Sequence, residues 1–225
     1  PYTPGFFLAL VPTILLLGRD MLAGRIISLI AAIGCCAVIS TIVHRVTGSR
    51  AAAFIAGLLP FSTRAFFVWA PLMRVDLLGA LFTLYGLNDA LHGNGRGRII
   101  RSAVWFSLAF LTKQTYIAAP LAVALCLLRR DRVAFVRFTV LFSTIILVAV
   151  GWLTLATNGW FLAHTIEGNL HDPFDSGRMR YWVGDVLIGG HLPLLLVALE
   201  GMRRAPGILS VYFVIALLSC ISAGN

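Results

Sequence analysis

Long apolar stretches, separated by short segments rich in arginine or glycine, follow one another along almost the whole chain. Hydrophobic residues make up 59% of the 225 residues and charged residues only 12%, whereas about 25% of the residues in a soluble domain are charged. A membrane-spanning helix needs roughly 17 to 25 mostly apolar residues. The pattern therefore predicts an all-α, polytopic membrane protein with about eight membrane passages. The apolar stretches are 26–43, 51–72, 75–91, 99–112, 115–128, 138–157, 186–202 and 205–223.

The distribution of arginine predicts how these passages are oriented. Basic residues collect in the short loops between alternate stretches, and loops of this kind face the cytoplasm. We therefore expect Gly95 and Arg132 on the inner side and Asn169 and Asp175 on the outer side. The formal net charge of +9 does not indicate a nucleic-acid partner, because no basic stripe alternates with aromatic residues on a polar face.

The chain is expected to be a single, incomplete transmembrane domain over residues 1–225. The opening run from Phe6 to Leu17 is too short to span a bilayer, so we expect a short helix that lies along the outer interface. The predicted segments are the end of an outer loop with this interfacial helix (1–25), a helix bundle (26–157), an outer loop (158–185) and two further helices (186–225).

Lys113 is the only lysine in the chain, and it lies between the apolar stretches 99–112 and 115–128. One helix over 99–128 would be about 45 Å long, which exceeds the roughly 30 Å hydrocarbon core. Because both flanks are rich in arginine, the segment is predicted to enter and return as a hairpin with Lys113 near its outer tip. Arms of about 21 Å place this tip below the outer surface. The ammonium there either holds an anionic group or extends to the interface as a snorkelling side chain.

Further charged residues are predicted on the same outer side. Arg64, Arg74 and Asp76 fall between the stretches 51–72 and 75–91. An acid in the first turn of a helix is favoured by the helix dipole, so Asp76 and Arg74 are explained either as a helix cap with its counter-ion or as a functional pair. Ionisable groups within membrane passages are candidates for function.

The outer loop holds a second set of polar candidates, which are His164, Glu167, Asn169 and His171. A helix would place His164 and Glu167 on one face because they are three residues apart. These two side chains with His171 could hold a divalent metal ion, but there is no HExxH motif, and hydrogen bonding in a hydrated loop is the favoured interpretation. No metal site is assigned.

Several motifs then follow in a recognisable order: YTPGFFLAL at the start, RVDLL around Asp76, LTKQ around Lys113 and NGWFLAHTIEGNLHDPF in the outer loop. This order resembles the bacterial GT-C membrane glycosyltransferases, the branch that includes protein O-mannosyltransferases and the aminoarabinose transferase of lipid A. RVDLL and LTKQ are the most specific parts of the resemblance, which covers most of the chain.

The resemblance implies a GT-C-type helix bundle in the inner membrane with its active side facing the periplasm. It implies a polyprenyl-phosphate-linked sugar as donor and a lipid, glycan or protein as acceptor. Lys113, with Arg74 or Arg64, would bind the donor phosphate, and Asp76 would be a supporting acid. The main catalytic base of the family lies upstream of the turn that PYTP represents here, so residues 1–225 alone are expected to be inactive.

Two other classes of protein remain as alternatives. A secondary transporter of a small anionic solute would need paired broken helices in two repeated halves, whereas the sequence has one broken pair and no repeat. A polytopic scaffold without a site would tolerate alanine at the outer polar positions. Nucleotide hydrolysis and serine-hydrolase chemistry have no support, because GxxxxGK[ST] and GxSxG motifs are absent.

Overall fold

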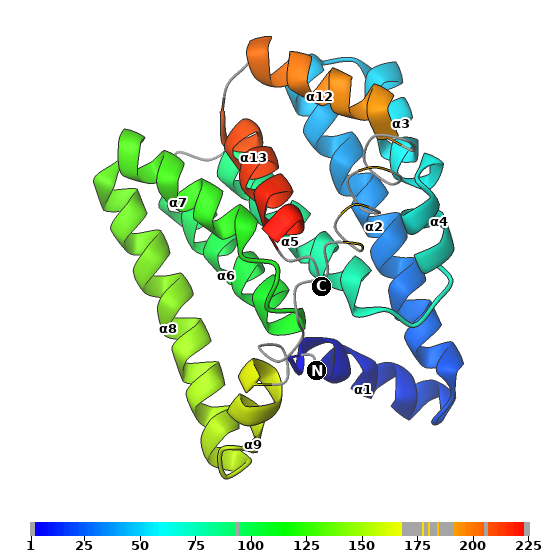
Figure 1. Ribbon diagram of the computed structural model, residues 1–225, viewed down its shortest axis with the longest axis vertical. Coiled ribbons are helices and arrows are strands. Elements are labelled where there is room, and N and C mark those ends of the chain that lie inside the picture. The colour runs from blue at the N-terminus through cyan, green and yellow to red at the C-terminus, as the bar shows by residue number, and fades with distance from the viewer. Residues whose placement is uncertain are drawn as a thin grey trace. The chain divides into compact units, whose positions relative to one another are not determined.

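The computed structural model describes residues 3–92, 95–167, 177, 180, 184, 191–204 and 207–222, and every regular element in this part of the chain is helical (Figure 1). The chain divides into two compact units, one formed by residues 2–117 and the other by Pro1 with residues 118–225.

The first unit begins and ends its helices at residues suited to these positions. The side chain of Asp20 accepts a hydrogen bond from the backbone N–H of Leu22, which caps one helix, and Ser49 caps the next in the same way. Gly48 ends the longest helix with φ = 69°, a conformation that favours glycine. The helices are α1 (Gly5–Leu17), α2 (Met21–Thr47), α3 (Arg50–Leu58), the 3₁₀ turn η1 (Leu59–Ser62), α4 (Arg64–Trp69), α5 (Val75–Leu91) and α6 (Arg96–Thr112).

Helix α2 packs against α5 through a stripe of small residues. Such residues let helix backbones approach closely, as is typical of membrane helices. Two of them also form hydrogen bonds across the interface: Ser28 Oγ donates to the carbonyl of Arg74 at 3.2 Å, and Cys35 Sγ donates to that of Leu77 at 3.7 Å. Helix α1 runs across the end of α2 (Figure 1) and completes an apolar core whose buried members include Phe6, Leu10, Ile27, Ala31, Leu77 and Leu78.

Helices α5 and α6 form the tightest pair in this unit. Gly86 of α5 lies directly under the ring of Phe106, where an added methyl group would come within 2.6 Å of the ring. Ser102 Oγ donates to the carbonyl of Gly86 at 2.9 Å. At the C-terminal end of α5, Arg101 binds both carboxylate oxygens of Asp89, with distances of 3.2 and 3.0 Å. The two helices are therefore held together along their length.

The turn before α1 lies on the C-terminal end of α6. Thr3 Oγ1 donates to the carbonyl of Phe110 at 3.2 Å. A methyl group on Gly5 would come within 2.5 Å of the carbonyl oxygen of Leu111, so only glycine permits this approach. The start of the first unit is thereby fixed close to the end of α6 in space, although about a hundred residues separate them in sequence.

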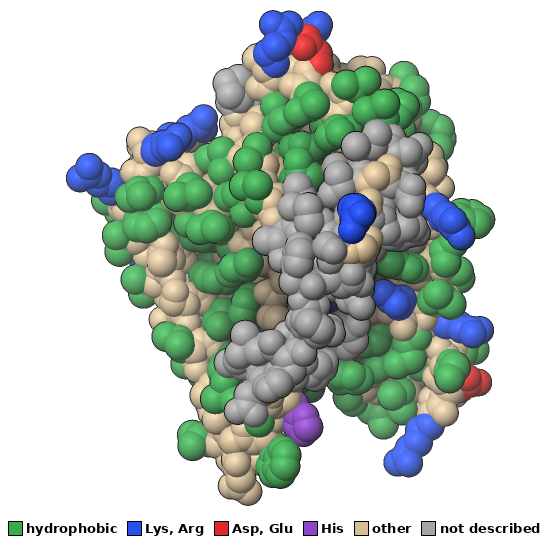
Figure 2. All heavy atoms as spheres, in the orientation of Figure 1, with side chains coloured by type: hydrophobic (Ala, Val, Ile, Leu, Met, Phe, Trp, Pro, Cys, Tyr) green, Lys and Arg blue, Asp and Glu red, His purple; other side chains and the backbone are tan. Residues whose placement is uncertain are grey.

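The second unit contains α7 (Ala118–Arg130), α8 (Arg132–Ala156), α9 (Trp160–Leu162), the π-helical turn η2 (Ala163–Glu167), α12 (His191–Arg204) and α13 (Ile208–Ser222). Asp131 caps α8 by accepting hydrogen bonds from the N–H groups of Val133 and Ala134, both at 3.0 Å. Much of α8 is apolar and exposed, including Leu147 and Trp152. Figure 2 shows many apolar side chains on the visible face of the molecule, as expected for a surface that meets lipid.

The fold confirms two predicted features and corrects a third. Helix α1 covers the expected short helix, although its place at a membrane surface stays a prediction. The break at Lys113 is confirmed, since α6 ends at Thr112 and the next helix begins at Ala118. The stretch 51–72 is not one continuous helix, however, but is divided into α3, η1 and α4. Among the described residues, only α2 and α8 are long and apolar enough to cross a membrane by themselves.

Candidate functional site

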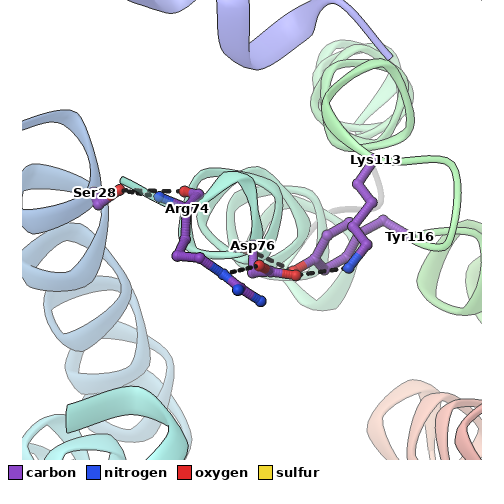
Figure 3. Close-up of polar contacts among 5 residues, drawn as sticks. All are labelled: Ser28, Arg74, Asp76, Lys113 and Tyr116. Carbon is purple, nitrogen blue, oxygen red and sulfur yellow. Dashed lines mark hydrogen bonds and ion pairs between the residues drawn. The ribbon is translucent and has the colours of Figure 1, made fainter. Parts of the chain in front are cut away.

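Asp76 lies in the first turn of α5, and both of its carboxylate oxygens form ion pairs. Oδ2 is 3.1 Å from Nε of Arg74, and Oδ1 is 2.7 Å from Nζ of Lys113. Its side chain is only 12% exposed. The two cations approach from opposite sides of the carboxylate (Figure 3), so one acid positions two basic groups from different parts of the chain.

Arg74 is held through both its backbone and its side chain. Its N–H donates to Ser28 Oγ at 3.0 Å, and the same hydroxyl donates to its carbonyl at 3.2 Å. The guanidinium lies over the ring of Trp69, 4.6 Å from the ring centroid, where a cation is attracted to the aromatic face. Within the described residues, only Nε of this guanidinium has a hydrogen-bond partner, and the side chain is 39% exposed. Its terminal nitrogens can therefore bind another group.

Lys113 lies at the end of α6, where it begins a tight turn. Its N–H completes the helix by donating to the carbonyl of Ala109 at 3.0 Å, and its own carbonyl accepts from the N–H of Tyr116 at 3.1 Å. The hydroxyl of Tyr116 donates to the backbone carbonyl of Asp76 at 2.5 Å. One turn thus contacts Asp76 twice, through the ammonium of Lys113 and through the hydroxyl of Tyr116 (Figure 3).

The charges of this cluster suit an anionic ligand. Two cations and one carboxylate leave one net positive charge in a partly buried place, where electrostatic attraction is stronger than in water. The fork of Arg74 can bind a phosphate through two donors, while the ammonium of Lys113 acts as a compact point charge. Next to Lys113, Oε1 of Gln114 is buried and has no hydrogen-bond partner in the described part of the chain, so it can accept a hydrogen bond from a ligand.

The structure does not bring every predicted residue into this cluster. Arg64 begins α4 and is exposed, and it takes part in no hydrogen bond or ion pair that involves the described residues alone. His164 is exposed and stacks on Trp160, with 5.4 Å between ring centroids. The side chain of Glu167 and all of Asn169 and His171 lie outside the described residues. In the described part, no three His, Cys, Asp or Glu side chains gather as a metal site would require, and the proposed metal ligands stay untested.

Reasoning from the sequence missed both partners that hold Arg74 besides Asp76. Ser28 and Trp69 were not predicted as site residues, because neither carries a charge that stands out in an apolar segment. The sequence held one signal for Ser28, because this residue places a hydroxyl group in a stripe of small residues on α2. No comparable signal points to Trp69, since aromatic residues are frequent in this chain.

Comparison with known proteins gives one result for this chain. A family model described as dolichyl-phosphate-mannose-protein mannosyltransferase matches residues 1–154, which is 154 of 225 residues and includes the whole Asp76 cluster. No curated protein and no solved structure matches the chain significantly.

Proposed function

The chain belongs to the dolichyl-phosphate-mannose-protein mannosyltransferase family, a family of GT-C membrane glycosyltransferases, and from this premise we propose that it moves a sugar from a polyprenyl-phosphate donor to an acceptor hydroxyl at the outer leaflet of the membrane. Membership of this family favours glycosyl transfer over the alternative of a secondary transporter. The acceptor is a lipid, a glycan or a protein.

The observation that carries this proposal is the pair of cations on Asp76. In the proposed reaction, the acceptor oxygen forms a bond to the anomeric carbon while the bond between that carbon and the phosphate oxygen breaks. The hydroxyl proton passes to a base, and the bonding electrons stay with the leaving lipid phosphate. Fixed cations at the place where this negative charge develops lower the barrier. Lys113 and the outer nitrogens of Arg74 are the groups that we assign to this phosphate.

Asp76 has a positioning role in this proposal. Each of its oxygens already binds a cation, so both oxygens are occupied in holding Lys113 and Arg74. We assign the removal of the acceptor's proton to an acidic residue upstream of Pro1, as the resemblance implies. Arg64 remains a weaker candidate for the phosphate, and the residues of the outer loop remain candidates for contacts with the sugar or the acceptor.

The proposal is tested by replacing Lys113 in the full-length protein, reconstituted with polyprenyl-phosphate sugars. Lys113→Ala removes a charge-assisted hydrogen bond of about 1.5 to 3 kcal/mol, and we expect turnover to fall about 10- to 150-fold. Lys113→Arg should restore only part of the loss, because a planar fork does not replace a compact ammonium.

Arg101→Ala provides the matched control for this experiment. Arg101 is also a cation in an ion pair between α5 and α6, but its partner Asp89 lies at the opposite end of α5. We expect normal turnover for this variant. Normal turnover of Lys113→Ala at normal expression would contradict the phosphate contact, and so would an equal loss of turnover in both variants.

A further inference from the structure

The turn that carries Lys113 is attached to α5 by a neighbouring aromatic residue. Tyr116 closes the turn by donating its N–H to the carbonyl of Lys113, and its hydroxyl reaches the backbone carbonyl of Asp76. Lys113 meanwhile reaches the carboxylate of the same aspartate. Both of these contacts of the turn therefore end on one residue of α5, Asp76.

A glycine on α5 provides the space for this ring. Gly79 is one turn beyond Asp76, on the same face of the helix. A methyl group on Gly79 would overlap the ring of Tyr116. It would lie only 2.7 Å from Cδ2 and 3.0 Å from Cζ, and closer still to Cε2. The hydroxyl reaches Asp76 only because position 79 has no side chain.

We infer that Tyr116, seated on Gly79, is a positioning residue that sets the location of the Lys113 ammonium. The hydrogen bond to Asp76 and the close approach at Gly79 are two independent observations that place the same ring. Without this contact, the position of the ammonium would depend more on the flexible lysine side chain, which has many rotamers. This inference deepens the proposed function, on which its importance for sugar transfer rests, but the position of Lys113 can be measured without any transfer.

The reactivity of Lys113 provides that measurement. Residues 1–225 contain no other lysine, so the acylation of this residue by an amine-reactive ester can be followed by peptide mass spectrometry in the reconstituted full-length protein. An ammonium engaged by a carboxylate is protected from the reagent. We expect Gly79→Ala, which displaces the ring, to raise the acylation rate about tenfold, and Tyr116→Phe, which keeps the ring but removes its hydroxyl, to raise it by a smaller factor.

Gly86→Ala is the matched control. Gly86 is also a glycine on α5 under an aromatic ring, that of Phe106, where an added methyl group would come within 2.6 Å. This variant disturbs the packing of α5 on α6 away from Lys113, and we expect it to leave the acylation rate unchanged. A second test uses the Tyr116→Ala background, in which Gly79→Ala should cause no further increase, because the ring that it would displace is absent.

Three results would overturn the inference: equal acylation rates in Gly79→Ala and Gly86→Ala, a wild-type rate in Tyr116→Ala, or additive effects in the double variant. Steady-state kinetics separate this question from the proposed function. A raised acylation rate with a lowered kcat and a nearly constant KM for the donor supports both ideas. A raised acylation rate with normal transfer supports the positioning role of Tyr116 and contradicts the role of Lys113 at the donor phosphate.

Discussion

At the scale of single residues, the two oxygens of Asp76 are not equivalent. One binds the compact ammonium of Lys113, and the other binds Nε of Arg74, which leaves the outer edge of that guanidinium open. A neutral side chain at this position would leave two neighbouring cations without their shared counter-ion. Their mutual repulsion would then push them away from the positions that a phosphate requires.

Asp76→Asn tests this role. We expect kcat to fall about 10- to 150-fold, which corresponds to the loss of a charged hydrogen bond, while the KM for the donor stays the same or decreases because the site becomes more positive. Steady-state kinetics with the reconstituted enzyme measure both quantities. A large rise in KM with an unchanged kcat would show instead that Asp76 helps to bind the donor in its ground state.

The charged members of the site could be predicted from the sequence, because a charge in an apolar segment is conspicuous. Lys113, Asp76 and Arg74 were identified in this way, and the structure brings all three together. The contact between Tyr116 and Gly79 could not be predicted. It depends on how far α6 and its turn are shifted along α5, and two apolar helices can pack in several registers with similar patterns of residues.

At the scale of helices, α2 carries the hydroxyl that fixes the start of α5. Ser28 is fully buried and forms two hydrogen bonds with the backbone of Arg74. Ser40, three turns further along α2, also donates a hydrogen bond to a neighbouring helix, to the carbonyl of Ala53 at 2.8 Å. Both serines therefore bind the backbone of a neighbouring element, but only Ser28 lies next to the site.

We expect Ser28→Ala and Ser40→Ala to destabilise the protein by similar amounts. Hydrogen bonds between membrane helices contribute about 0.6 kcal/mol on average and up to about 1.7 kcal/mol, which corresponds to a decrease in Tm of a few degrees. Only Ser28→Ala should also lower sugar transfer, since it releases Arg74. Thermal unfolding in detergent and transfer assays distinguish the two effects, and an equal loss of activity in both variants would show that stability alone is responsible.

The division of the stretch 51–72 illustrates what composition alone cannot predict. Its length and apolar character favour one membrane passage, but the helix changes at Leu59–Ser62 into a 3₁₀ turn that includes Pro60. Proline lacks the N–H group that an α-helix needs and its ring clashes with the preceding turn. Pro60 could be seen in the sequence, but a prediction from hydrophobicity alone does not take proline into account.

At the scale of the whole molecule, the Asp76 cluster lies entirely within the unit of residues 2–117. Among the described residues, α2, α5, α6 and the turns beside them provide the hydrogen bonds that position its two cations. The candidate site is thus a property of the first unit, and contacts with the outer loop of the second unit stay predictions.

The orientation of the whole chain in the membrane is also a prediction that can be tested. Single cysteines at positions 95 and 175, introduced into a cysteine-free background, would be labelled with a membrane-impermeant reagent in intact cells. We expect Asp175→Cys to react and Gly95→Cys to react only after the membrane is opened, because arginine-rich loops are retained in the cytoplasm. The reverse pattern would invert every loop and place Lys113 on the cytoplasmic side.

The interruption at Lys113 has a consequence for the biosynthesis of the protein. Helix α6 begins with three arginines within its first six residues, and α7 has only 13 residues, which is about 20 Å of helix. Neither helix is therefore expected to insert into the membrane as a span by itself. We expect the insertion machinery to accept the two helices as one unit, with the ammonium of Lys113 entering the membrane beside the carboxylate of Asp76 on α5, which offsets its charge.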